Sequence, residues 1–279
     1  MRADLHIHTY YSDGKYSPHE IARRAAESGL DLISMTDHDS LEGLPEKRAA
    51  AREAGLSFIA GWEVSSYAGD AKVHVLGYGC RPCAAYEQFL EERKRGALVR
   101  AGEMIAKGNA YFHLSLSLAD AERFHLKKSA PLHTMHVVSA FSEQLGIGKG
   151  ELYLSAFASG CPCYSGRMRP APQDAIRVIH ASGGIASLAH PGRIPLDGDA
   201  RFALMNELAD GGLDGIECYH SDHTFTEAER FASFARERGL LITGGSDFHA
   251  EGRNRVIGQP PFRPSEALLE VFSRLEGSK

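Results

Sequence analysis

The sequence predicts an α/β fold with a largely parallel sheet, because strand-like and helical segments alternate along most of its 279 residues. Seven short segments have the apolar runs or period-two alternation of strands: 3–8, 31–36, 57–63, 72–78, 185–190, 214–219 and 240–246. Helical segments follow most of them and stop directly before a glycine: 17–28, 41–54, 173–182, 200–210 and 226–238. Glycine ends helices readily because it adopts the left-handed conformation. Repeated strand–helix–glycine units are typical of parallel βα folds.

Residues 84–172 interrupt this alternation. Segment 86–107 reads as a long charged helix, and shorter helical pieces follow it up to residue 156. We therefore expect one α/β domain built from residues 1–83 and 173–279, with residues 84–172 as a helical insertion that caps the strand ends. The alternative is that the insertion only covers a sheet edge. Residues 264–275 predict one further helix near the C-terminus.

Composition excludes several classes of function. Hydrophobic residues make up 43% of the chain, enough for a sizeable core, and the formal net charge of −5 gives no general basic field for long nucleic acid. The absence of a signal-peptide-like segment and of a long apolar run predicts a cytoplasmic protein without a membrane partner. The five cysteines lack zinc-ribbon spacing and are expected to be free thiols, although Cys80, Cys83, Cys161 and Cys163 could together bind zinc.

The first strand ends in a His-x-His pair. Because side chains alternate along a strand, His6 and His8 point to the same side and could bind one metal ion together. Asp13 follows five residues later in a Ser-Asp-Gly turn, close enough to add a carboxylate. This spacing predicts a metal site at the amino-terminal strand.

Nearly every predicted strand carries a metal-type ligand at or near its C-terminal end. They are His6 and His8, His38, Glu63, His74, His190, Glu217 and His220, and Asp247 and His249. In a parallel α/β barrel these ends meet on one face, where active sites are built. The number of ligands suggests more than one ion, and imidazole with carboxylate suits zinc, manganese or iron. Carboxylates can bridge two such ions, as hydrolytic centres require.

Six segments carry a family resemblance: HIHTYYSDG, TDHDS, GWEVS, HVLGY, AHPG and GSDFH, in this order. The chain resembles the polymerase-and-histidinol-phosphatase (PHP) family of metal-dependent phosphoesterases. It is most similar to small stand-alone members with a helical insertion, which include nucleotide phosphatases and a cyclic phosphodiesterase. The resemblance implies a distorted seven-stranded (β/α)7 barrel, with residues 84–172 as the insertion, and three bound divalent metal ions, which would be Mn, Fe or Zn.

The resemblance also implies a ligand set for each ion. The first ion would be held by His6, His8, Glu63 and Asp247. Glu63 would bridge to a second ion that is also held by His74 and His133, with His136 as the neighbouring alternative to His133. The third ion would be held by Asp13, His38 and His249.

A phosphate substrate needs donors beyond the metals. The candidates are Arg167 and Arg169 in SGRMRP, Arg193 in AHPGR, and His223 in ECYHSDHT, of which the resemblance favours His223. His190 and Asp247 are the predicted catalytic residues. His190 would protonate a leaving alkoxide or orient a ligand.

These residues predict hydrolysis of a small phosphorylated metabolite, a nucleotide or sugar phosphate in monoester or cyclic diester form. A metal-bridging hydroxide would attack phosphorus. Alternatives within the class are a histidinol phosphatase and an exonuclease acting on short RNA, whose partner would be a short oligonucleotide. Alternatives from other classes are an amide or lactone hydrolase on a similar barrel and a non-catalytic regulatory domain.

Overall fold

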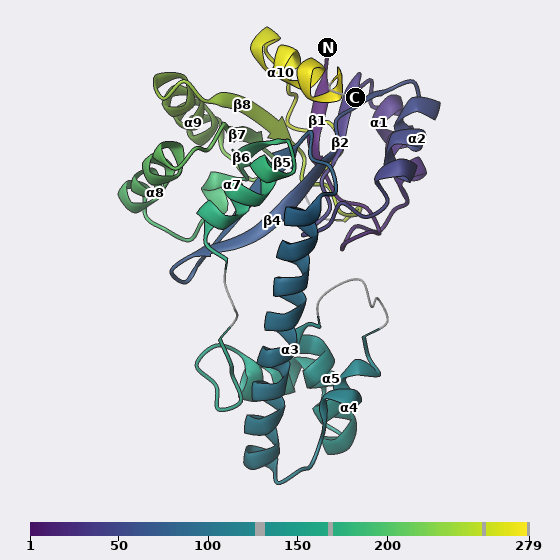
Figure 1. Cartoon of the computed structure of the whole chain (residues 1–279), viewed down its shortest axis with the longest axis vertical. Coiled ribbons are helices and arrows are strands. Elements are labelled where there is room, and N and C mark those ends of the chain that lie inside the picture. Colours follow the sequence, from purple (N-terminus) through teal and green to yellow (C-terminus); the bar gives the residue numbers. More distant parts are fainter. Residues whose placement is uncertain (126–131, 167–169, 253–254, 278–279) are drawn as a thin grey trace. The chain divides into compact units, whose positions relative to one another are not determined.

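A computed structural model describes residues 1–125, 132–166, 170–252 and 255–277. The chain divides into two compact units, and Figure 1 colours them by sequence. One unit comprises residues 1–86 and 170–279, and the other comprises residues 87–169. The predicted sites at Arg167 and Arg169 lie outside the described residues.

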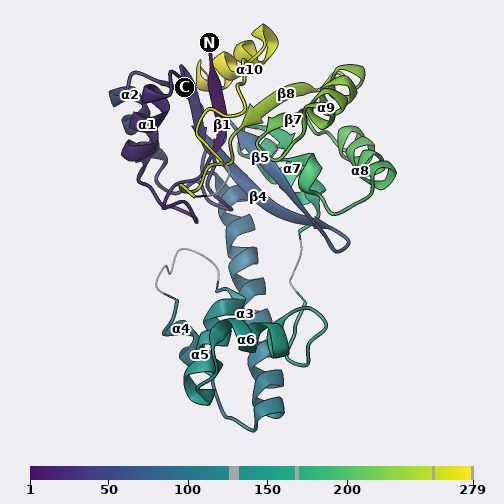
Figure 2. The same cartoon turned by 180° about the vertical axis from the view of Figure 1, so that it is seen from behind.

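The first sheet of the larger unit is parallel, with the order β1-β2-β3. Its strands and the helices that follow the first two of them are β1 (Ala3–Ile7), α1 (Pro18–Glu27), β2 (Leu32–Met35), α2 (Leu44–Glu53) and β3 (Ser57–Phe58). Helix α1 begins where the sequence predicts it to begin, because Ser17 and Glu20 form a capping box and Pro18 occupies the first turn. Helices α1 and α2 lie beside β1 and β2 (Figures 1 and 2).

The second sheet is mixed and has the order β4-β5-β6-β7-β8. Its strands are β4 (Gly61–Ala68), β5 (Ala71–Tyr78), β6 (Ile185–Leu188), β7 (Gly215–His220) and β8 (Leu241–Gly245). The helices around it are α7 (Pro172–Ala181), the short 3-10 helix η2 (Pro191–Arg193), α8 (Gly198–Asp210), α9 (Phe225–Glu237) and α10 (Glu266–Gly277). Helices α8 and α9 lie beside β7 and β8, on the side away from α1 and α2 (Figures 1 and 2).

Two strand predictions are wrong. The expected strand 57–63 is two strands, β3 and β4, so Glu63 is the third residue of β4 and does not end a strand. Strand β5 runs antiparallel to both β4 and β6. Only Gly69 and Asp70 separate β4 from β5. A two-residue connection is too short for the crossover that parallel strands require. His74 therefore lies midway along β5.

The larger unit is thus a mixed α/β fold of two sheets with isolated bridges between them. Ile7 of β1 pairs with Phe248 after β8, and His38 after β2 pairs with Glu63. These contacts are possible because β1 and β8 approach closely. A Cβ atom on Gly245 would lie 2.5 Å from the backbone nitrogen of His6, so only glycine fits there.

The smaller unit and the segment joining it to the larger one are helical. Its elements are α3 (Ala84–Phe112), α4 (Leu118–Glu122), α5 (Thr134–Leu145), α6 (Lys149–Leu152) and a single π-helical turn, η1 (Tyr153–Phe157). It has its own core, in which Met104, Phe141 and Phe157 are fully buried. Within the described ranges, every helix is too short or too polar to cross a membrane.

Candidate metal centre

The first group of side chains comes from three segments far apart in the sequence. His6 and His8 extend from β1, Glu63 lies in β4 and Asp247 follows β8, and all four side chains are buried. The Nε2 atoms of the two histidines are 3.2 Å apart. The Oε2 atom of Glu63 lies 3.4 Å from His6 Nε2 and 3.3 Å from His8 Nε2, and the Oδ1 atom of Asp247 lies 3.5 and 3.2 Å from the same two atoms.

These separations fit a metal ion at the centre of the group. Ligand atoms that sit about 2.0–2.1 Å from a tetrahedral metal are about 3.3–3.4 Å from one another. Glu63 Oε2 and Asp247 Oδ1 are buried and accept no hydrogen bond among the described residues. A buried carboxylate oxygen without a donor is costly, and a cation bound there would remove that cost. The four residues therefore suit the first ion that the resemblance implies.

Glu217 of β7 sets the proton position on His6. Its Oε1 atom lies 2.9 Å from His6 Nδ1, and its Oε2 atom accepts the backbone N–H of His190 at 2.7 Å. When His6 Nδ1 donates to Glu217, the lone pair of Nε2 faces the group of four. The sequence placed Glu217 at a strand end but gave it no role. The geometry makes it the carboxylate that orients a ligand.

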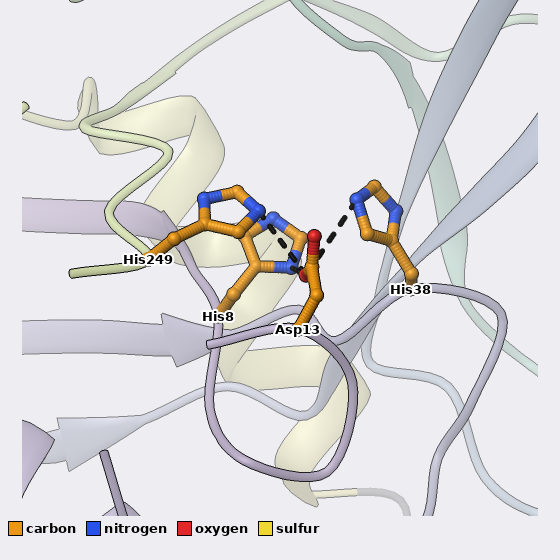
Figure 3. A group of neighbouring side chains, drawn as sticks. All are labelled: His8, Asp13, His38 and His249. Carbon is orange, nitrogen blue, oxygen red and sulfur yellow. Dashed lines mark ion pairs between the residues drawn. The ribbon is translucent and has the colours of Figure 1, made fainter. Parts of the chain in front are cut away.

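A second group surrounds Asp13, as Figure 3 shows. Its Oδ1 atom lies 3.2 Å from His249 Nε2, 3.7 Å from His8 Nδ1 and 3.9 Å from His38 Nε2. His249 Nδ1 donates to the backbone carbonyl of Asp247 at 2.9 Å, so its Nε2 lone pair faces Asp13. The three residues predicted for the third ion are therefore adjacent, and His8 lies beside them.

Glu63 also belongs to a third group, with His38 and His74. Its Oε1 atom is 2.6 Å from His74 Nδ1, and its Oε2 atom is 3.0 Å from His38 Nδ1. His74 Nε2 is buried and has no hydrogen-bond partner in the described part of the chain. His133, predicted as the other ligand of this ion, is the exposed residue before α5 in the smaller unit. His136 accepts the backbone N–H of His133 at its Nδ1 atom, at 3.0 Å.

The buried carboxylates control the charges of the nearby imidazoles. Burial alone would lower the pKa of His8, but Asp247 and Glu63 outweigh it and raise the pKa to about 9. The pKa of His6 is also raised despite burial, by Glu217, Glu63 and Asp247. Without a metal, protons on these two rings would balance the carboxylates. A divalent cation would replace those protons.

Asp247 also faces a histidine and two arginines through its second oxygen. Its Oδ2 atom lies 3.3 Å from His220 Nε2, 3.0 Å from Arg193 Nη1 and within hydrogen-bond distance of Arg255 Nη1. Both arginines also pair with Asp222, at 3.4 Å from Arg193 and 2.6 Å from Arg255. Sequence reasoning identified Arg193 and missed Arg255, which follows the GSDFH motif by six residues.

The two remaining predicted histidines have different surroundings. His190 is buried, with Nε2 2.9 Å from Glu63 Oε1, and burial lowers its pKa to about 4 despite Glu63. Its imidazole is therefore neutral near pH 7, and the geometry favours orientation of Glu63 over proton donation. His223 has both ring nitrogens engaged by backbone, with Nδ1 at 2.8 Å from the carbonyl of Cys218 and Nε2 accepting the N–H of Gly192 at 3.1 Å.

Several known proteins are similar to this chain over most of its length. A curated phosphoribosyl 1,2-cyclic phosphate 1,2-diphosphodiesterase of Eggerthella lenta is 31% identical over 92% of this chain and 98% of its own. A 3',5'-nucleoside bisphosphate phosphatase of Chromobacterium violaceum is 33% identical over 96% of both chains. A 5'-3' exoribonuclease of Haemophilus influenzae is 31% identical over 88% of this chain and 89% of its own.

Two solved structures share the fold. One, described as an amidohydrolase of Chromobacterium violaceum with bound sulfate and no metal, is 29% identical, with a TM-score of 0.73 over 99% of this chain and 96% of that one. The other, described as a putative metal-dependent phosphoesterase of Bifidobacterium adolescentis, is 23% identical, with a TM-score of 0.72 over 98% and 96%. Residues 4–144 match the PHP domain. The chain belongs to the PHP family.

Proposed function

We propose that this protein is a metal-dependent phosphoric ester hydrolase that acts on a small phosphorylated substrate. The observation that carries the proposal is the buried group of His6, His8, Glu63 and Asp247, whose ligand atoms have the mutual spacing of a metal's coordination shell. The cations on the outer oxygen of Asp247 lie next to this group and suit an anionic substrate.

The protein's own residues would bind and orient the ions and the substrate. His6, His8, Glu63 and Asp247 would hold the first of three ions, Glu63 and His74 would contribute to the second, and Asp13, His38 and His249 would hold the third. Bound Mn, Fe or Zn would supply a hydroxide nucleophile near neutral pH and offset charge on the phosphoryl oxygens. Glu217 would keep the Nε2 atom of His6 free of a proton.

The substrate phosphate would be held by arginines. Arg193 and Arg255 would turn from Asp247 and Asp222 toward a phosphate oxygen, since guanidinium groups bind phosphate through paired N–H donors. Arg167 and Arg169 remain candidates from the family resemblance. His223, which the family resemblance favours as a phosphate contact, would instead stabilise the turn at Gly192, beside Arg193, by accepting the Gly192 N–H.

We favour a phosphate ester of a ribosyl group or nucleoside as substrate, in monoester or cyclic diester form. The three curated relatives are named for a phosphoribosyl cyclic phosphate, a nucleoside bisphosphate and RNA. The proposal also includes a distorted barrel formed by the two sheets and a cytoplasmic location. The bridges between β1 and the end of β8 and between His38 and Glu63 support the barrel.

The test is a substrate screen with purified protein loaded with Mn²⁺, Fe²⁺ or Zn²⁺. The panel contains a cyclic ribosyl phosphodiester, a 3',5'-nucleoside bisphosphate, short 5'-phosphorylated RNA, histidinol phosphate, and an amide and a lactone. Metal-dependent cleavage of one of the first two is expected. Cleavage of RNA alone would favour the exonuclease, and hydrolysis of only the amide or lactone would contradict the proposal. Absence of any turnover with all three metals would also contradict it.

A further inference from the structure

Helix α2 carries a lysine that turns away from solvent. Lys47 is only 1% exposed, and its Nζ atom lies 2.6 Å from Oδ2 of the fully buried Asp37. A buried ammonium group requires a partner because its desolvation is costly. No metal ligand set described above includes either residue, yet Asp37 directly precedes His38.

Asp37 connects this pair to the loop that carries Asp13. Its carboxylate accepts the backbone N–H of Thr9 at 2.8 Å, the hydroxyl of Thr9 at 2.7 Å and the hydroxyl of Ser12 at 2.7 Å. With Lys47, both carboxylate oxygens thus have two donors each. The first turn of the loop is therefore attached to α2 through one buried carboxylate.

The adjacent residue of α2 attaches the same loop from its outer side. Glu46 accepts the hydroxyl of Tyr11 at 2.6 Å and that of Tyr10 at 3.0 Å. The ring centre of Tyr11 lies 5.5 Å from Lys47 Nζ, a cation–π contact. Glu46 and Lys47 therefore hold four consecutive residues of the loop, 9–12, either directly through their side chains or through Asp37.

Asp13 itself has little to hold it in place. Its side chain is 56% exposed, and its contacts are with His8, His38, His249 and the hydroxyl of Ser12. Its position is therefore set by the loop backbone. Within that loop, the N–H groups of Ser12 and Gly14 both donate to the carbonyl of Thr9, at 3.1 and 3.0 Å. Thr9, the residue attached to Asp37, is thus the anchor of the turn.

We propose that Lys47 is a positioning residue for the metal site around Asp13. Through Asp37 it fixes Thr9 and Ser12, and thereby the approach of Asp13 to His38 and His249. The part of this inference that concerns metal binding rests on the proposed function. The part that concerns loop order does not.

The first experiment measures loop order in EDTA-treated protein by amide hydrogen exchange. Lys47→Met should speed exchange of the Ser12 and Gly14 amides at least about tenfold, while amides of β7 and β8 keep their rates. Arg52→Met is the matched control, because it removes one positive charge from an exposed position of the same helix. Unchanged exchange in the loop, or equal acceleration throughout the larger unit, would overturn the inference.

The second experiment titrates Mn²⁺ into the same proteins by calorimetry. Lys47→Met should weaken the Mn²⁺ binding event that Asp13→Asn also weakens, by about 10–100-fold, and should weaken the other binding events less. If Lys47→Met does not fold, Thr9→Val removes one hydrogen bond to Asp37, keeps the buried pair and should weaken the same event. Normal binding by the folded variant would overturn the metal part of the inference. Absence of any Mn²⁺ binding by the wild type would instead contradict the proposed function, and hydrogen exchange would still decide the role of Lys47.

Discussion

Glu217 offers a direct test of how the first metal site is prepared. In Glu217→Gln, one oxygen of the side chain becomes an NH₂ group, although two N–H donors, His6 Nδ1 and the His190 amide, point at this position. The backbone amide cannot change, so the remaining oxygen should stay with His190. The new NH₂ group then faces His6 Nδ1, which can accept from it only if the imidazole proton moves to Nε2.

That proton would occupy the coordinating atom. His6 Nε2 lies 3.2 Å from His8 Nε2 and 3.4 Å from Glu63 Oε2, where the proposed ion would sit. Loss of such an orienting carboxylate lowers metal affinity about 10–100-fold, which is about 1.4–2.7 kcal/mol. Calorimetric titration with Mn²⁺ measures the loss. Glu229→Gln is the control, because Glu229 lies outside the site and accepts a hydrogen bond of 3.3 Å from Tyr219. Wild-type affinity in folded Glu217→Gln would refute the reasoning.

Three further changes test other parts of the site. Arg255→Met should raise KM for the phosphate substrate about tenfold with a smaller change in kcat, as measured by steady-state kinetics; an unchanged KM would exclude the proposed contact. Gly245→Ala should lower the free energy of unfolding by about 1–3 kcal/mol, as measured by urea denaturation, because the added Cβ would overlap His6. Gly150→Ala is the control: its added Cβ has no atom within 4 Å, so the free energy of unfolding should not fall. Mn²⁺ binding at pH 7.5 should release about one proton or more, and its affinity should rise up to about pH 9, because His8 has a pKa of about 9 and must lose its proton to coordinate. Calorimetry in two buffers of different ionisation enthalpy measures the number of protons released, and identical binding heats in the two buffers would contradict the predicted release.

Local patterns predicted where most strands and helices lie but not how the strands pair. Apolar alternation indicates a strand equally well whichever way the chain runs, so it could not show that β5 is antiparallel to its neighbours. The continuous apolar segment around Ile59 also concealed the break between β3 and β4. The short Gly69–Asp70 connection was the available signal for a hairpin.

The same limit applies to the site. The side chains of His6, His8, Glu63 and Asp247 meet as the strand-end argument expects, although Glu63 and His74 lie within strands. These side chains meet because the strands come together even where their directions differ. Strand patterns could not identify Lys47 or Arg255, because neither lies on a strand and nothing local shows that a lysine in an alanine-rich helix turns inward.

His8 contacts both the group around Asp13 and the group formed with His6, Glu63 and Asp247. Its Nε2 atom is 3.3 Å from Glu63 and 3.2 Å from Asp247, whereas its Nδ1 atom is 3.7 Å from Asp13 and 3.4 Å from the Ser12 hydroxyl. A neutral imidazole has one lone pair and one N–H, so it can coordinate on only one side. The shorter contacts place the lone pair at Nε2, and the N–H then points to the Asp13 loop (Figure 3). The loop therefore sets the tautomer of a ligand in the first site, and a displaced Asp13 should weaken both sites.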